Sequence, residues 1–215
     1  DDYPKMKDII FDAIQNPTFP SSEITLAKER KAENYKRSLS DATGHHSEYR
    51  SKILYKDQTA GISREDKVNI IQNLSEKEIK ELYKKYFNAK SAIVTLFGDL
   101  ELEEAKEYAK ELLEIVPDKK VTGTETPMIV TAFDDTFENK YDFEQVNIDL
   151  NFAAPTKNDA DFNTMKVIES VFSGSRGRIH KAVRGTDKDL AYFAFPSYSY
   201  TKDYGYVRIT TQTSV

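Results

Sequence analysis

The sequence predicts an α+β fold in which a mostly antiparallel β-sheet is flanked by helices. Residues 146–152 alternate between apolar and polar side chains, as in a strand with one buried face. The aromatic-rich stretch 190–200 is followed by a turn and by a second strand-like stretch at 206–213, so the two are expected to pair in antiparallel fashion. Between these strands, apolar residues at helical spacing predict a helix that begins near Asn158 or Asp159.

Helices are expected to dominate the first 90 residues. A helix over 4–15 is ended by two prolines. The next helix, over 21–41, carries so many charges that it is expected to lie on a surface or to line a cavity. Gly44 is expected to break it, and a further helix reaches Tyr55.

The centre of the chain combines helices with two expected strands. Ser75 and Glu78 form a capping-box pattern that predicts a helix over 76–86. The apolar stretch 92–97 predicts a buried strand, and 128–133 predicts another. The single glycine after the first of these strands, with no Lys-Ser or Lys-Thr behind it, does not match a phosphate-binding loop.

Composition excludes several classes of function. The 31 basic and 36 acidic residues are mixed along the chain and give a net charge of -5, so no nucleic-acid partner is expected. No apolar run approaches the ~20 residues that a membrane-spanning helix needs. The chain has no cysteine, so it has neither a disulfide framework nor a thiolate for metal binding.

The histidines do not form a recognisable metal motif. His45 and His46 are adjacent, so on a helix their side chains point about 100° apart. They cannot share a metal ion as two histidines one helical turn apart can. Both are therefore expected at a solvated helix start.

Several short motifs in a fixed order resemble the pitrilysin and insulinase family of zinc metallopeptidases, the inverzincins. They are Asn16-Pro-Thr-Phe-Pro20, Leu74-Ser-Glu-Lys-Glu78, Ala92 to Asp99, Ala153-Ala-Pro155, Ser173-Gly-Ser-Arg176, Val183-Arg184 and Leu190-Ala-Tyr192. The resemblance covers almost the whole chain.

The resemblance implies a parent protein that hydrolyses peptides with zinc, and it also implies that this chain lacks the metal. The family holds zinc with an H-x-x-E-H motif, which is absent here, and with a downstream glutamate. Alignment with the family places Asn34 at the position of that glutamate, which marks a non-catalytic domain. Glu33, one residue earlier and rotated by about 100°, is the weak candidate for a metal ligand.

The resemblance further implies that Arg184 and Tyr192 bind the substrate peptide. A guanidinium and a phenol suit a peptide carbonyl and the oxyanion that develops from it. Here the two residues are eight positions apart, one more than is usual in the family. The alternative stays open that Arg184 lies at a helix C-terminus because the helix dipole favours it there, and that Tyr192 packs in a sheet.

We therefore expect residues 1–117 to be the later part of one family domain, 118–142 a linker with a connecting strand, and 143–215 the early part of the next domain. The expected function is the substrate-binding, non-catalytic portion of a zinc endopeptidase that cleaves peptides in an enclosed chamber. The alternative is a catalytically inactive, peptidase-like partner or scaffold subunit. Expected partners are a peptide substrate, a catalytic zinc-bearing half or subunit, and a second copy of the chain. The bacterial cytoplasm and periplasm are both compatible with the sequence.

Overall fold

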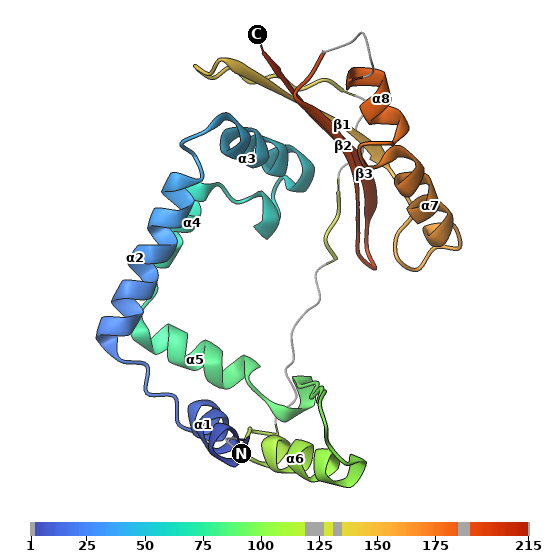
Figure 1. Cartoon of the computed structure of the whole chain (residues 1–215). Coiled ribbons are helices and arrows are strands. Elements are labelled where there is room, and N and C mark those ends of the chain that lie inside the picture. Colours follow the sequence, from blue (N-terminus) through green and yellow to red (C-terminus); the bar gives the residue numbers. More distant parts are fainter. Residues whose placement is uncertain (1–2, 119–126, 131–134, 185–189, 215) are drawn as a thin grey trace. The chain divides into compact units, whose positions relative to one another are not determined.

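The computed structural model describes residues 3–118, 127–130, 135–184 and 190–214 (Figure 1). The α-helices are α1 (Tyr3–Gln15), α2 (Ser21–Arg37), α3 (Ala42–Tyr55), α4 (Arg64–Asn73), α5 (Glu76–Tyr86), α6 (Leu102–Glu114), α7 (Phe162–Phe172) and α8 (Arg178–Arg184). Two short 3-10 helices are η1 (Thr59–Gly61) and η2 (Ala89–Ser91), and the strands are β1 (Gln145–Ala153), β2 (Phe193–Tyr200) and β3 (Gly205–Ser214). The α+β class expected from the sequence is confirmed.

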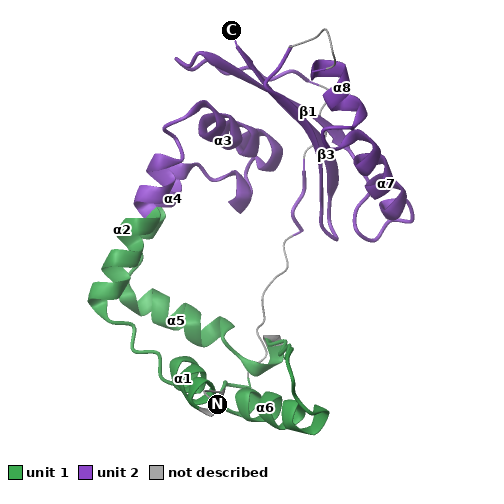
Figure 2. Ribbon diagram, viewed as in Figure 1, with its two compact units in different colours: residues 1–31, 70–125 green, residues 32–69, 126–215 purple. Residues whose placement is uncertain are grey.

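The chain divides into two compact units that interleave in sequence (Figure 2). Unit 1 consists of Asp1–Lys31 and Ile70–Glu125, and unit 2 consists of Ala32–Asn69 and Thr126–Val215. This division reflects compactness, whereas the expected boundaries at 117 and 142 concern family domains. Those boundaries stay a prediction.

Unit 2 is built on an antiparallel sheet with the strand order β1-β3-β2. Directly opposite residues of neighbouring strands lie on the same face, so the register shows which side chains share each face of the sheet. One face carries the apolar side chains of β1, and α7 and α8 lie on that side of the sheet in Figure 1. The other face carries the polar residues of β1, and α3 lies on that side.

The apolar face is closed over β2 by aromatic contacts from α7. The ring centroid of Phe162 lies 4.7 Å from that of Tyr200 and 6.0 Å from that of Tyr198, which is only 7% exposed. Glu169 on α7 accepts a hydrogen bond of 2.8 Å from the backbone N–H of Tyr198. The helix ends before Gly174, whose φ of 76° lies in the left-handed region that favours glycine.

Two helix boundaries differ from the sequence prediction because nearby aspartates cap elsewhere. The side chain of Asp159 accepts a hydrogen bond from the backbone N–H of Thr156 in a turn, and α7 begins only after Asp161. Similarly, Asp41 caps α3 by accepting a hydrogen bond of 2.7 Å from the N–H of Gly44. Gly44 therefore lies inside α3, and the break between α2 and α3 precedes it.

In unit 1, the predicted capping box at the start of α5 is confirmed. The backbone N–H of Glu78 donates to the Ser75 hydroxyl at 3.2 Å, and the N–H of Ser75 donates to the Glu78 carboxylate at 2.7 Å. The Ser75 hydroxyl also donates to the Glu78 carboxylate at 2.7 Å, and this bond, followed by the bond from the Ser75 N–H, lowers the pKa of Glu78. Tyr83 on α5 donates to the carbonyl of Ile14 at 2.7 Å and so links α5 to α1.

The expected strand over 92–97 is wrong for this structure. No backbone ladder joins this segment to any other described part of the chain, and a strand exists only where such a ladder forms. The first three residues of the expected strand 128–133 also form no ladder, because the backbone of Ile129 is hydrogen bonded to the side chain of Gln58 instead. The remaining residues, 131–133, lie outside the described structure. The strand expected over 190–200 begins only at Phe193.

Candidate functional site

Arg184 and Tyr192, the two residues expected to bind a peptide, lie together at the end of α8. The Nη1 atom of Arg184 donates a hydrogen bond of 2.7 Å to the backbone carbonyl of Tyr192. The backbone N–H of Tyr192 in turn donates to the carbonyl of Gln212 on β3 at 2.9 Å. The backbone of Tyr192 is thus fixed against the sheet, while the side chains of both residues are exposed.

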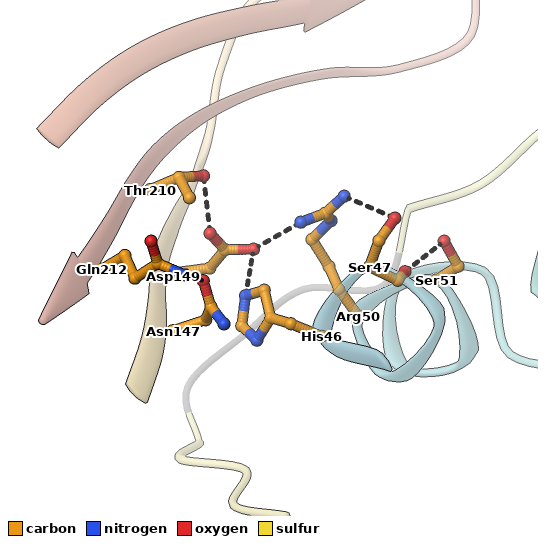
Figure 3. A network of polar contacts seen from close by, with 8 residues as sticks. All are labelled: His46, Ser47, Arg50, Ser51, Asn147, Asp149, Thr210 and Gln212. Carbon is orange, nitrogen blue, oxygen red and sulfur yellow. Dashed lines mark hydrogen bonds and ion pairs between the residues drawn. The ribbon is translucent and has the colours of Figure 1, made fainter. Parts of the chain in front are cut away.

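A second polar site, which the sequence reasoning missed, joins α3 to the polar face of the sheet (Figure 3). Its centre is Asp149 of β1, whose side chain is only 5% exposed. The Oδ2 atom of Asp149 lies 2.8 Å from Nη1 of Arg50 and 2.9 Å from Nε2 of His46. The hydroxyl of Thr210 on β3 donates to the Oδ1 atom at 2.6 Å.

The contacts of Asp149 determine its charge state. Burial by itself would raise the pKa of this carboxyl group, but contacts with His46, Thr210 and Arg50 and the positive charge of Arg50 outweigh burial. The pKa of Asp149 therefore lies well below its usual range, and the group is ionised. At the other end of α3, burial and contacts with Tyr206 and Tyr204 raise the pKa of Tyr55 far above its usual value.

The expectation that both histidines lie at a solvated helix start is wrong. The side chain of His46 is 19% exposed, and the ring of His45 packs 4.4 Å from Tyr141, centroid to centroid. The sequence did contain one indication of the contact between α3 and Asp149. His46 and Arg50 are four residues apart, so on a helix they share one face, and Asp149 interrupts an otherwise neutral polar strand face.

The described residues do not fit a zinc site. No group of three or more histidine, aspartate or glutamate side chains lies close enough together in the described part of the chain to hold a metal ion. The carboxylate of Glu33, the candidate ligand, is exposed and lies 3.8 Å from the ammonium of Lys36. The amide oxygen of Asn34 accepts a hydrogen bond of 3.0 Å from Arg37. The role of Glu33 stays a prediction.

A family comparison covers the greater part of the chain. Residues 73–215, more than half of the chain, match the peptidase M16 inactive domain. The chain belongs to the peptidase M16 family, as the motifs predicted. The matched domain is the one that the family description calls inactive. Among curated proteins, none matches the chain significantly.

Solved structures support the fold. The peptidase M16 inactive domain from Pseudomonas fluorescens is 16% identical, with a TM-score of 0.77, and covers 97% of this chain and 51% of its own. A protease from Helicobacter pylori is 16% identical, with a TM-score of 0.82, over 99% of this chain and 52% of its own. A chain of Complex III2 from Candida albicans is 9% identical, with a TM-score of 0.69, over 97% of this chain and 50% of its own.

The chain therefore spans about half the length of these structural relatives. Within the residues that the structure describes, no helix is both long and apolar enough to cross a membrane.

Proposed function

We propose that the chain is the non-catalytic, substrate-binding portion of a peptidase M16 protein that encloses peptides, and that Arg184 and Tyr192 contact the bound peptide. The observation that carries this proposal is the hydrogen bond between the Arg184 guanidinium and the Tyr192 carbonyl, which holds the two exposed residues together. The match to the inactive domain supports the absence of catalysis in this segment. The similarity to a Helicobacter pylori protease supports peptides as the ligand class.

The chemistry of the pair suits an extended peptide. A guanidinium presents five N–H donors in a rigid fork, and a phenol can donate or accept. Peptide carbonyls, which recur at every residue, are acceptors for both groups. Because the bond to Tyr192 uses a backbone carbonyl, Tyr192→Phe keeps the bond and removes only the phenolic hydroxyl.

Binding of fluorescently labelled, unstructured peptides to the chain tests this proposal. A hydrogen bond from a charged donor contributes about 1.5 to 3 kcal/mol, so Arg184→Ala should weaken binding roughly 10- to 150-fold. Tyr192→Phe should weaken it less. The matched control is Arg178→Ala, which removes the same charge from an exposed position of the same helix.

The control distinguishes a specific site from a basic surface. If Arg178→Ala weakens binding as much as Arg184→Ala does, the peptide is attracted by the positive charge of α8 in general. That result, or a complete lack of peptide binding by the wild-type chain, would contradict the proposal.

A second candidate function is a catalytically inactive partner or scaffold subunit. It is favoured by the similarity to a chain of Complex III2, a multi-subunit assembly. A peptidase assay on the whole natural protein separates the two functions, because only the first predicts that Arg184→Ala lowers kcat/KM there.

The proposal includes partners for the chain. Zinc, the metal of the family, would be held by a catalytic half or by a partner subunit, since the described residues of this chain do not fit it. In isolation, the chain is proposed to pair with a second copy. Exposed apolar side chains along the edge strand β1, such as Leu150 and Phe152 at 53% exposure each, support association. Light scattering over a range of concentrations measures it.

A further inference from the structure

The polar face of the sheet in unit 2 contains a row of three side chains, each with one buried polar atom that has no hydrogen-bond partner among the described residues. Asn151 of β1 and Ser197 of β2 both lie directly opposite Arg208 of β3, so the three side chains share one face. The Oδ1 atom of Asn151, the Oγ atom of Ser197 and the Nε atom of Arg208 are all buried and unpaired among the described residues.

Buried polar atoms without a partner are concentrated in this row. The described residues contain four such atoms in total, and the fourth, Nε2 of His46, has an ion-pair contact with Asp149. Buried polar atoms are normally paired, because leaving one unpaired costs about 1 to 3 kcal/mol, and more for a charged group. Three neighbouring unpaired atoms therefore mark a place where polar partners from outside the described residues are expected.

The charge of the face indicates that such a partner is an anion. Both oxygens of Asp149, the acidic group on this face, are occupied by Arg50, His46 and Thr210. Arg208 thus adds a positive charge that no carboxylate of the described residues neutralises. A water molecule could satisfy the hydrogen bonds of the row, but it would leave this charge uncompensated.

The three unpaired atoms are themselves buried, and the side chains beside them on the β2 side are in part exposed. Each of the three residues of the row is only partly buried. Phe195, which lies two residues before Ser197 and therefore on the same face, is 53% exposed. Helix α3 packs on this face at both of its ends, through Arg50 on Asp149 of β1 and through Tyr55, whose ring centroid lies 6.2 Å from that of Tyr204 just before β3.

We propose that Arg208, Asn151 and Ser197 bind a carboxylate group. A carboxylate has two oxygens that accept hydrogen bonds, and charge-assisted bonds to a guanidinium are among the strong ones. Arg208 donates through Nε, and Ser197 donates through its hydroxyl. Asn151 donates through its amide nitrogen once the side-chain amide turns over. The carboxylate belongs to a peptide, either at its C-terminus or on an acidic side chain.

The site is tested by observing the side-chain Nε–H signal of Arg208 by NMR during titration with sodium acetate. The expected result is a saturable shift that sodium chloride at equal ionic strength does not produce. The Nε–H signal of the exposed Arg178 is the internal control and should not saturate. An Arg208 signal that responds equally to acetate and chloride, or that shifts only in parallel with Arg178, would overturn the proposal.

Variants and peptides sharpen the test. Ser197→Ala should weaken acetate binding roughly tenfold, and Arg208→Met should abolish it. Arg178→Ala, at an exposed position of α8, should leave it unchanged, and the carboxylate site does not rest on the proposed role of Arg184. Unchanged acetate binding by folded Ser197→Ala and Arg208→Met proteins would contradict the assignment.

Three peptides of otherwise equal sequence identify the source of the carboxylate. One has a free C-terminus, one is amidated, and one is amidated and contains a glutamate. Displacement of acetate by the first alone assigns a C-terminal carboxylate, and displacement by the third assigns an acidic side chain. Displacement by none of them would contradict a peptide ligand.

Discussion

The sheet of unit 2 and the segment 92–97 of unit 1 share a composition that favours strands, but they differ in structure. Both are rich in β-branched and aromatic residues, which favour strands. Every residue of β1 is paired with β3, whereas 92–97 has no ladder partner in the described chain. Local sequence therefore sets a preference for a strand, but a strand forms only where a neighbouring strand is available to pair with it.

The unpaired segment leaves apolar surface uncovered. Ile93 is 93% exposed and Phe97 is fully exposed, whereas Val94 and Leu96 between them are half-buried. A hollow of about 330 Å³ lies along the segment and is also lined by Leu112 of α6. In unit 2, by contrast, Tyr198 and Tyr206 of the paired strands are buried.

The largest expected difference between the two regions is in the rate of amide hydrogen exchange. The central strand β3 is paired on both sides, so its amides should open only with much of unit 2. We expect them to exchange roughly a thousandfold or more slowly than the amides of 92–97, after correction for sequence. Equal protection of the two regions would show that 92–97 is paired in solution.

The substitution Asp149→Ala tests how much the long-range contacts of Asp149 stabilise unit 2. Removing this buried carboxylate leaves Arg50 and His46 without their shared carboxylate partner. Such a change costs about 3 to 5 kcal/mol. Urea unfolding of the variant should show this loss, while Asp203→Ala, at an exposed turn position of the same unit, should cost less than about 0.5 kcal/mol. A loss below 1 kcal/mol for Asp149→Ala would mean that α3 is held on the sheet by other contacts.

The same contact gives unit 2 a defined dependence on pH. The pKa of Asp149 is lower in the folded chain than in the unfolded chain, so its stabilising contribution is fully present above the unfolded value of about 4. That contribution is lost as the pH falls through the folded pKa. The difference in unfolding free energy between wild type and Asp149→Asn should not shrink between pH 7 and 5, and it should shrink at strongly acidic pH. Shrinkage already between pH 7 and 5 would contradict the lowered pKa.

The smallest expected change in unfolding free energy comes from removing a local contact in unit 1, the helix cap at Ser75. Ser75→Ala removes the hydroxyl that caps α5 and should cost about 1 kcal/mol in the unfolding free energy. Ser40→Ala, which removes an exposed hydroxyl that does not cap a helix N-terminus, is the control. Equal unfolding midpoints for the two variants would show that the capping box adds nothing to the stability of α5.

Local patterns in the sequence were sufficient for the elements that local interactions determine. The capping box at Ser75, the end of α7 before Gly174 and the hairpin of β2 and β3 were all predicted from neighbouring residues. The start of α7 was misplaced because several aspartates and an asparagine compete for the cap position, and their hydrogen bonds depend on the turn that precedes the helix.

Contacts between distant residues could not be predicted in the same way. His46 and Asp149 are about a hundred positions apart, and only the folded unit brings them within 2.9 Å. The eight-residue separation of Arg184 and Tyr192 left their geometry open, and residues 185–189 between them lie outside the described structure. Their hydrogen bond emerged only from the packing of α8 beside β2.

The most direct test of peptide binding without cleavage is equilibrium dialysis of an unstructured peptide against the chain in the presence of equimolar zinc. Mass spectrometry then measures the peptide in both chambers. If the proposed role is right, the peptide accumulates on the protein side and keeps its full length. Equal peptide concentrations in the two chambers would contradict the binding role. Shortened peptides, lost again when zinc is chelated, would contradict the non-catalytic role.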